Sequence, residues 1–294
     1  KDTKEQDAYR QYGITCMESG KYEDAVKAFQ NALGESIGHI GEKELDICFY
    51  KAKAQALDGK TKDALATYNA IIKYNKDARA YYLRGDLYMD MGEEKKGRAD
   101  FESAVQQGKK NYEIYIGIYE SLSRHEKKDE GQKYLSAAME IKGDKPEDEL
   151  YKGRISYLLG ENKDAISYLE KAKEHKQMLA SYYLGLAYDA NGDSDKAKKC
   201  IAEYIKSGVA TSYDLYELGM QEMQDGNYKN ALTYFNSGLE LEKVPNKQNL
   251  MKSAIAAYEY SGDFDSAKKM MKEYLKAYPD DEEAKHENTF LETR

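Results

Sequence analysis

The sequence predicts an all-α protein built from about eight helical hairpins in tandem. Two observations set the repeat: pairs of glycines stand seven residues apart, and a small residue follows the second glycine five residues later. A third is the composition, because 41% of residues are hydrophobic and 33% are charged. That balance is typical of helices with one buried stripe and a solvated outer face.

The small residue after the second glycine gives the most complete register. It occurs eight times, with gaps of 39, 33, 34, 34, 32, 34 and 36 residues, at Ala25, Ala64, Gly97, Gly131, Ala165, Ala197, Ala231 and Ala267. The glycine pairs themselves are Gly13/Gly20, Gly85/Gly92, Gly153/Gly160, Gly185/Gly192 and Gly219/Gly226. Repeats of this length are typical of stacked supersecondary units.

A helical hairpin explains each part of this pattern. Glycine at the end of a first helix adopts the left-handed conformation that other residues resist. Asp193, Asn227 and Asp263 follow such glycines and are suited to cap a second helix. That helix repeats a small, a large and a small residue on one face, as in Ala25, Phe29 and Ala32. We expect the first glycine and the alanine to be small because the two helices approach closely there.

After a tether at residues 1–5, the hairpins are predicted at 6–44, 45–77, 78–111, 112–145, 146–177, 178–211, 212–247 and 248–279. Residues 34–44 add about five residues to the first repeat, which indicates a longer loop or longer helices. The fourth repeat departs most, with Glu126 in the turn. Acidic residues after Pro279 predict a short capping helix within 280–294.

These motifs resemble the tetratricopeptide repeat (TPR) over about residues 6–279. Leu184, Gly185 and Tyr188 match its first helix, as do Leu218 and Gly219, and Pro279 matches the terminal proline. Tryptophan is absent, with Tyr9, Tyr81 and Tyr115 in its slot, and the late proline is missing from nearly every repeat. The resemblance implies a single elongated, right-handed α-solenoid without a catalytic centre. Its concave wall, formed by the first helices, would bind a peptide or a partner-protein segment.

Helical phase predicts which side chains of the first helices face that groove. In the first four repeats they are mostly charged: Arg10, Ile14, Asp46, Lys53, Arg79, Tyr82, Asp86, Asp90, Glu113, Glu120 and Arg124. In the fifth to seventh repeats they are apolar or aromatic: Leu150, Tyr157, Leu179, Tyr182, Leu186, Tyr213, Tyr216, Met220 and Met223. We predict that the second set binds the partner. Packing of these residues between repeats, or docking of Phe290 and Leu291 onto them, are the alternatives.

Other function classes find less support. The net charge of −8, with lysines interleaved among more numerous acids, argues against nucleic acid. The three cysteines are isolated, no metal or cofactor motif is present, and no apolar run is long enough to span a membrane. The slots of a chaperone-type carboxylate clamp carry Arg10 and Ile14 and lack its asparagine, so that activity is not predicted.

Two alternatives to a scaffold remain. Groove carboxylates such as Asp86 and Glu120 would serve an enzyme as an acid/base pair, but no nucleophile, metal set or phosphate loop accompanies them. A peptide-sensing regulator would carry its effector domain outside this chain. For location, the composition is typical of an AT-rich bacterial genome. With the polar start at Lys1, it favours an envelope lipoprotein anchored upstream of that residue over a cytoplasmic protein.

Overall fold

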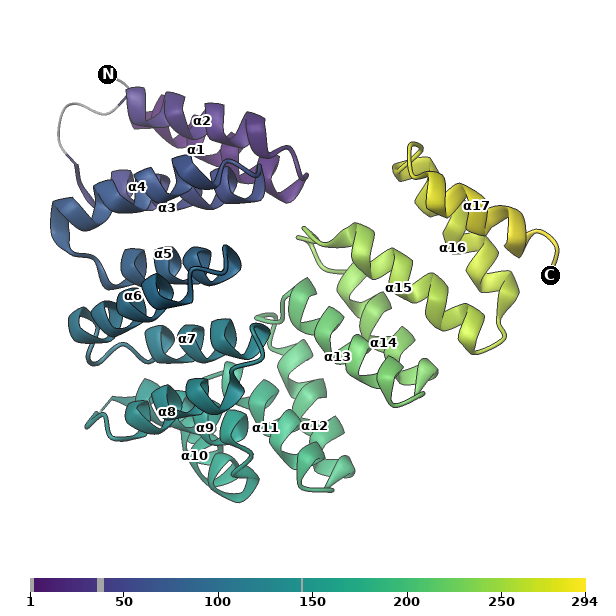
Figure 1. Ribbon diagram of the computed structural model, residues 1–294. Helices are drawn as coiled ribbons and strands as arrows, with labels where there is room; N and C mark the ends of the chain where they lie inside the picture. The colour runs from purple at the N-terminus through teal and green to yellow at the C-terminus, as the bar shows by residue number, and fades with distance from the viewer. Residues whose placement is uncertain (1–2, 36–39, 144) are drawn as a thin grey trace. The chain divides into compact units, whose positions relative to one another are not determined.

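The computed structural model describes residues 3–35, 40–143 and 145–294. Within those ranges the regular structure consists of seventeen α-helices, and the same ranges contain no strand (Figure 1). The prediction of an all-α repeat protein is therefore confirmed. The chain divides into two compact units, Lys1–Tyr204 and Ile205–Arg294, which are described separately below as unit 1 and unit 2.

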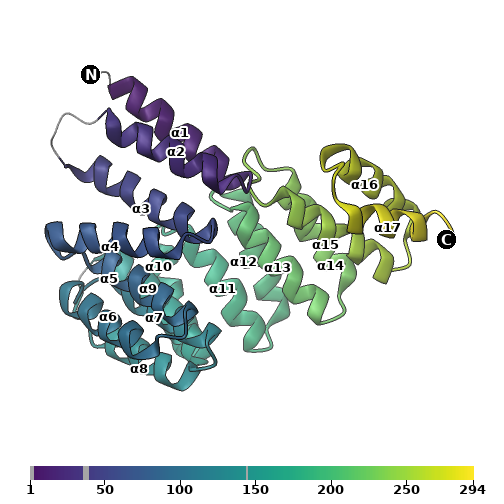
Figure 2. The same cartoon turned by 45° about the horizontal axis from the view of Figure 1, so that its top comes forward.

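Unit 1 is a succession of helices connected within each pair by turns of two or three residues. Each pair packs on the next through its second helix, so that α2 contacts α3, α4 contacts α5 and α10 contacts α11 (Figures 1 and 2). The helices are α1 (Thr3–Glu18), α2 (Tyr22–Gly34), α3 (Glu42–Leu57), α4 (Thr61–Asn75), α5 (Ala78–Asp90), α6 (Glu94–Gln107), α7 (Tyr112–Arg124), α8 (Lys128–Met139), α9 (Pro146–Leu159), α10 (Asn162–Glu174), α11 (Leu179–Ala190) and α12 (Ser194–Lys206).

Unit 2 continues the same local plan after the end of α12. Its helices are α13 (Ser212–Gln224), α14 (Tyr228–Leu239), α15 (Lys247–Tyr260), α16 (Phe264–Ala277) and α17 (Glu282–Leu291). α13 packs on α14 and α15 packs on α16, while α14 also contacts α15. Asn246 donates a hydrogen bond of 3.1 Å to the carbonyl of Ser212, which ties the start of α15 to the start of α13.

The first glycine of each pair lies where two helices cross at short range. A Cβ atom on five of these glycines would stand 2.3 to 2.8 Å from the side chain sixteen positions later on the second helix. Such a distance leaves no room for a methyl group. The five contacts join Gly13 to Phe29, Gly85 to Phe101, Gly153 to Leu169, Gly185 to Ile201 and Gly219 to Phe235. The expected reason for the first glycine is therefore confirmed at these positions.

The turn between the two helices uses the left-handed backbone conformation, as expected. Gly160 ends α9 with a φ of 83°. In the fourth repeat Glu126 takes the same region with a φ of 61°, although it carries a side chain. The packing of neighbouring repeats imposes this turn although glycine is absent. Holding Glu126 in the left-handed conformation therefore costs free energy of folding.

Two helices near the N-terminus begin earlier than the approximate repeat bounds suggest. α1 begins at Thr3, so part of the predicted tether is helical. α3 begins at Glu42, three residues before the predicted start of its repeat, because the Gly41 N–H donates to the Glu44 carboxylate at 2.9 Å and caps an extra turn. Residues 36–39, in the segment where we predicted a longer loop or longer helices, lie outside the described residues.

α17 forms the short helix expected after Pro279. Asp281 caps it by accepting a hydrogen bond of 3.0 Å from the Ala284 N–H. Leu291 is fully buried and joins the same apolar cluster as Met271 and Tyr274 of α16. The C-terminal helix therefore covers an apolar face of the last pair of helices.

Candidate partner-binding site

Most of the charged side chains predicted to line the first half of the groove form ion pairs between neighbouring first helices. Arg10 on α1 contacts Asp46 on α3 at 2.5 Å. Arg124 on α7 contacts Asp86 on α5 at 2.5 Å, with Asp90 3.8 Å away. These charges are thus largely neutralised within the protein, and each pair links two successive hairpins.

Arg154 on α9 is the member of this series that sequence reasoning missed. Its guanidinium lies 3.3 Å from Glu113 and 3.0 Å from Glu120, both on α7. Burial by itself would lower the pKa of Arg154, but Tyr183 and the two carboxylates outweigh it and raise that pKa. Helical phase places Arg154 four residues after Leu150, so the signal was present. The apolar neighbours led us to treat that whole face as apolar.

The two carboxylates considered above as an acid/base pair each form an ion pair with an arginine. Asp86 is engaged by Arg124 and Glu120 by Arg154, so each carboxylate has a different cationic partner. Within the described ranges, no three His, Cys, Asp or Glu side chains are grouped so that they could hold a metal ion. No helix in the same ranges has the length and apolar character needed to cross a bilayer.

Between α3 and α5 the surface of unit 1 is hollowed. The hollow has a volume of about 460 Å³, within the size range of ligand pockets. Four residues predicted for the charged half of the groove line it, together with apolar side chains and one tyrosine from α4. The lining is Phe49, Tyr50, Lys53, Ala56, Leu57, Tyr68, Arg79, Leu83, Asp86, Leu87 and Asp90.

The charged side chains that line this hollow are not all paired, in contrast to the ion pairs described above. Asp86 and Asp90 face Arg124, and Asp90 also lies 3.2 Å from the His125 ring. Lys53 and Arg79 have no acidic partner among the residues that the structure describes. Instead, the Arg79 guanidinium lies 4.5 Å above the Phe49 ring. The hollow therefore presents two cations whose hydrogen-bond donors are available.

Tyr68 lies at the α4 side of the hollow and is only 4% exposed. Its hydroxyl makes no hydrogen bond within the described part of the chain. Burial raises the pKa of Tyr68 to about 12, with a smaller opposing effect from Arg79 and a raising effect from Asp86. The phenol is therefore neutral at physiological pH and has a proton to donate.

The apolar residues predicted in unit 1 are mostly packed. Leu150 is 8% exposed and belongs to the core, so it is not available to a partner. Tyr157 packs against the same cluster, and burial raises its pKa. The Tyr182 ring lies 5.2 Å from the Tyr204 ring of α12. Leu186 is half-buried, and Leu179 is exposed.

In unit 2 the predicted residues divide in the same way. Tyr213 is 55% exposed on α13. The Tyr216 ring lies 6.2 Å from Phe235, and Met220 and Met223 pack against the cluster that contains Phe235. Tyr216, Met220 and Met223 are therefore engaged in packing, and the contact of Tyr216 with Phe235 lies within one hairpin. Leu291 is buried in unit 2, as described above, which removes it from the docking alternative.

Two family profiles described as tetratricopeptide repeat match the chain, one over residues 51–112 and the other over 179–207 and 248–281. The chain contains tetratricopeptide repeats. The first match contains most of the residues that line the hollow. The fold of this TPR protein is that of a protein–protein interaction scaffold, since such arrays present extended binding surfaces.

Several solved structures are similar to this chain. A TPR protein from Parabacteroides merdae is 12% identical, with a TM-score of 0.50 over 86% of this chain and 99% of that chain. PilW, a type IV pilus biogenesis factor, is 18% identical, with a TM-score of 0.47 over 71% of this chain and 97% of that one. The C-terminal part of a TPR protein from Cytophaga hutchinsonii is 14% identical, with a TM-score of 0.40 over 83% and 98%. No protein of curated function matches the sequence.

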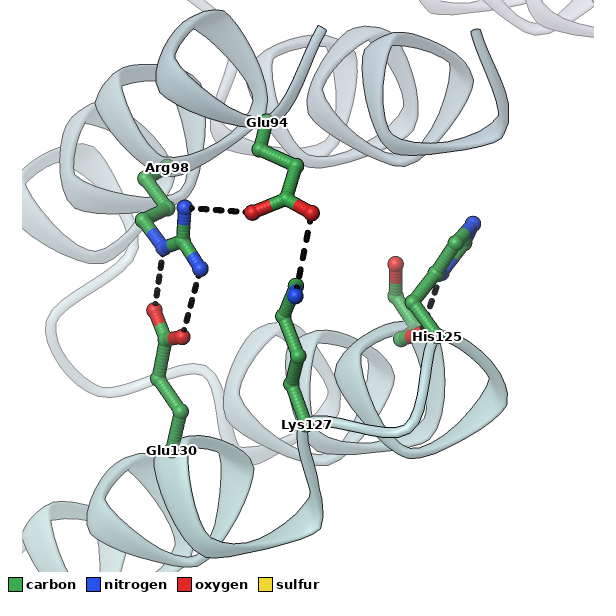
Figure 3. Close-up of polar contacts among 6 residues, drawn as sticks. Glu94, Arg98, His125, Lys127 and Glu130 are labelled. Atoms are coloured by element: carbon green, nitrogen blue, oxygen red, sulfur yellow. Dashed lines mark hydrogen bonds and ion pairs between the residues drawn. The ribbon is translucent and has the colours of Figure 1, made fainter. Parts of the chain in front are cut away.

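This TPR protein also carries a charge cluster on the second helices, which our sequence reasoning did not find. Arg98 on α6 makes two hydrogen bonds to Glu130 on α8, of 2.7 and 2.9 Å, and a third to Glu94 (Figure 3). Lys127 completes the cluster at 3.0 Å from Glu94. The hydrogen bond from Arg98 lowers the pKa of Glu130, and those from Lys127 and Arg98 lower that of Glu94. Because its charges satisfy one another, the cluster joins two hairpins and leaves little for a ligand.

Proposed function

We propose that this TPR protein is a non-catalytic scaffold that binds a segment of a partner protein in the hollow between α3 and α5. The observation that carries the proposal is the hollow itself, about 460 Å³ in volume and bordered by two first helices. Its lining combines apolar surface with charge. Leu57, at the end of α3, leaves 49% of its surface exposed at this site. A partly open apolar lining with a few polar groups is typical of binding sites.

A difference between neighbouring helices supports this location. Ion pairs join α1 to α3, α5 to α7 and α7 to α9. Among the described residues no ion pair joins α3 to α5, although apolar residues of both helices share one cluster and Arg79 stacks on Phe49. We expect a partner segment to enter there, because no ion pair between these two helices would have to be broken.

Peptide selection tests the proposal. Peptides selected from a random displayed library against the purified chain should bind the wild type and should lose affinity for the Leu57→Asp variant. Met178→Asp is the matched control, because Met178 is 50% exposed and does not line the hollow. Selected peptides that bind both variants equally well, or the failure to select any peptide, would contradict the proposed site.

Tyr213 defines a second candidate surface, because it is the large apolar residue on α13 that stays open to solvent. The same peptides can be measured against Tyr213→Ala. A loss of affinity in this variant, with none in Leu57→Asp, would move the site to unit 2.

A lipid-anchored envelope location and a regulatory role remain expectations from the sequence. The gene region upstream of Lys1 distinguishes them. A signal peptide ending in cysteine supports the first, and a long preceding domain supports the second.

A further inference from the structure

We infer that the hollow between α3 and α5 selects an acidic residue, Asp or Glu, that apolar residues flank in the partner segment. The inference rests on the proposed function and adds the chemistry of the bound segment. It depends on the hydrogen-bond donors of the lining that have no partner among the described residues: those of Lys53 and Arg79, which are exposed, and that of Tyr68, whose side chain is largely buried.

Three side chains of the lining carry hydrogen-bond donors that have no acceptor among the described residues. Lys53 and Arg79 carry full positive charges and have no acidic partner in the described part of the chain. Tyr68 adds a hydroxyl from a side chain that is 96% buried, since its exposed fraction is 4%, and this hydroxyl makes no hydrogen bond there. These three groups come from α3, α5 and α4 and border one cavity. A carboxylate accepts up to four hydrogen bonds and donates none, so it suits all three.

The acids of the lining are already engaged. Asp86 accepts a hydrogen bond of 2.5 Å from Arg124. Asp90 lies between Arg124 and the His125 ring, at 3.8 and 3.2 Å. Both carboxylates are therefore attracted toward α7, which leaves the α3 side of the hollow positive.

Stacking fixes the geometry of one donor. The Arg79 guanidinium lies 4.5 Å above the Phe49 ring, so its face is occupied while its N–H groups point outward along its edge. Less side-chain entropy is lost when a carboxylate binds to a guanidinium held in this way. Around these polar groups, Leu57, Leu83 and Leu87 provide apolar contacts for the flanking residues.

Two matched peptide libraries test the inference. One contains labelled nonapeptides with a central Asp or Glu and randomised Leu, Ile, Phe, Tyr or Met beside it, and the other has Asn or Gln at the centre. Measured by fluorescence anisotropy, the best acidic peptides should bind at least about tenfold more tightly than their amide counterparts. Their affinity should fall as NaCl is raised.

Three variants assign the effect to the hollow. Lys53→Glu with Arg79→Glu should weaken binding of the acidic peptides at least about tenfold. Lys62→Glu with Lys73→Glu on α4 makes the same change in net charge on exposed lysines outside the lining, and should leave binding unchanged. Tyr68→Phe removes a hydroxyl that has no hydrogen-bond partner among the described residues, so it should keep the fold and weaken binding about threefold.

The outcomes separate this inference from the proposed function. Amide peptides that bind as tightly as acidic ones, and that still respond to Leu57→Asp, would overturn the inference and keep the site. Acidic peptides that respond equally to the Lys53/Arg79 and Lys62/Lys73 variants would also overturn it, because the attraction would then follow net charge. If neither library binds, the proposed site itself is wrong.

Discussion

The Phe101 ring lies against Gly85 so closely that a Cβ atom on the glycine would stand 2.8 Å from it. The backbone carbonyl of Gly97 would be 3.0 Å from the same atom. A ring can turn, but a helix backbone moves only if the two helices separate. The contact between these residues sets the distance between α5 and α6.

Gly85→Ala should therefore destabilise the protein, even though alanine favours helix by about 1 kcal/mol. Overpacking costs about 1–3 kcal/mol, and subtracting the helix preference of alanine leaves an expected net loss of up to about 2 kcal/mol. Urea unfolding measures it. Gly34→Ala is the control, since no atom of the described residues lies within 4 Å of the added methyl group, and it should be neutral or stabilising. Equal effects at both positions would mean that the helices have room to spare.

Glu126→Gly should stabilise the protein by about 0.5–1 kcal/mol. Glu126 holds a φ of 61° in the turn between α7 and α8, a region that glycine adopts without strain. Glu140→Gly supplies the control, because Glu140 ends α8 with an ordinary φ of −75°. Thermal unfolding of the two variants should move in opposite directions. A lower melting temperature for Glu126→Gly would show that its side chain contributes more than its backbone costs.

Arg154→Met should reveal the coupling between α7 and α9. Removing the guanidinium leaves Glu113 and Glu120 without their shared cation, but both carboxylates are more than half exposed. Solvent screening limits the expected loss to about 1 kcal/mol. A double-mutant cycle with Glu120→Gln should give a coupling energy that shrinks in 1 M NaCl. A coupling that does not depend on salt would contradict an electrostatic origin.

Asp281 should make the docking of α17 sensitive to acid. Tyr274 donates a hydrogen bond of 2.5 Å to its carboxylate, Lys252 lies 2.9 Å away, and the pKa of Asp281 falls below its ordinary value of 3.8. The folded state thus binds this proton less tightly than the unfolded state. The stabilisation is fully present above pH 3.8 and disappears as the pH falls through the lowered pKa. Asp281→Asn should therefore speed hydrogen exchange in α17 at pH 7, with a smaller difference from the wild type in strong acid.

Glu259→Gln should stabilise the protein, whereas Asp281→Asn should weaken the docking of α17. One Glu259 carboxylate oxygen is buried without a hydrogen bond. Burial, followed by repulsion from Glu287, raises the pKa of Glu259 above 4.5. The ionised form therefore destabilises the fold above the raised pKa, and this cost is absent well below pH 4.5.

The Glu259→Gln variant should accordingly melt higher than the wild type at pH 7, and the gain should be smaller at pH 3.5. Glu273→Gln on the exposed side of α16 controls for the loss of one negative charge. If both variants gain equally at pH 7, the net charge of the chain would account for the change.

The contact of Gly85 with Phe101 was predictable because both residues lie in one hairpin, sixteen positions apart. Local rules of turn and helix geometry fix such contacts. The pairing of Arg124 with Asp86 is different. These residues lie 38 positions apart, and their meeting depends on how far one hairpin is displaced along the next. Helical phase predicts which face of a helix a residue occupies, but it does not predict which residue of the next hairpin it pairs with.

The apolar set shows the same limit. Leu150 and Leu179 have the same expected orientation, but one is buried in the core and the other is exposed. Helical phase cannot distinguish them, because their burial depends on which of the two is covered by a neighbouring helix. Lys53 and Asp86 likewise have the same expected position on the groove face. Only the structure shows that Asp86 forms an ion pair and that Lys53 forms none with the described residues.

α17 occupies a face of α16 that a further hairpin would otherwise need, with Leu291 seated beside Met271 and Tyr274. A face of this kind is complementary to helices from any copy of a repeat protein. By filling it from within the same chain, α17 removes a route by which separate molecules would join end to end. The hydrogen bond between Tyr274 and Asp281, which ties the start of α17 to α16, would therefore also disfavour end-to-end association.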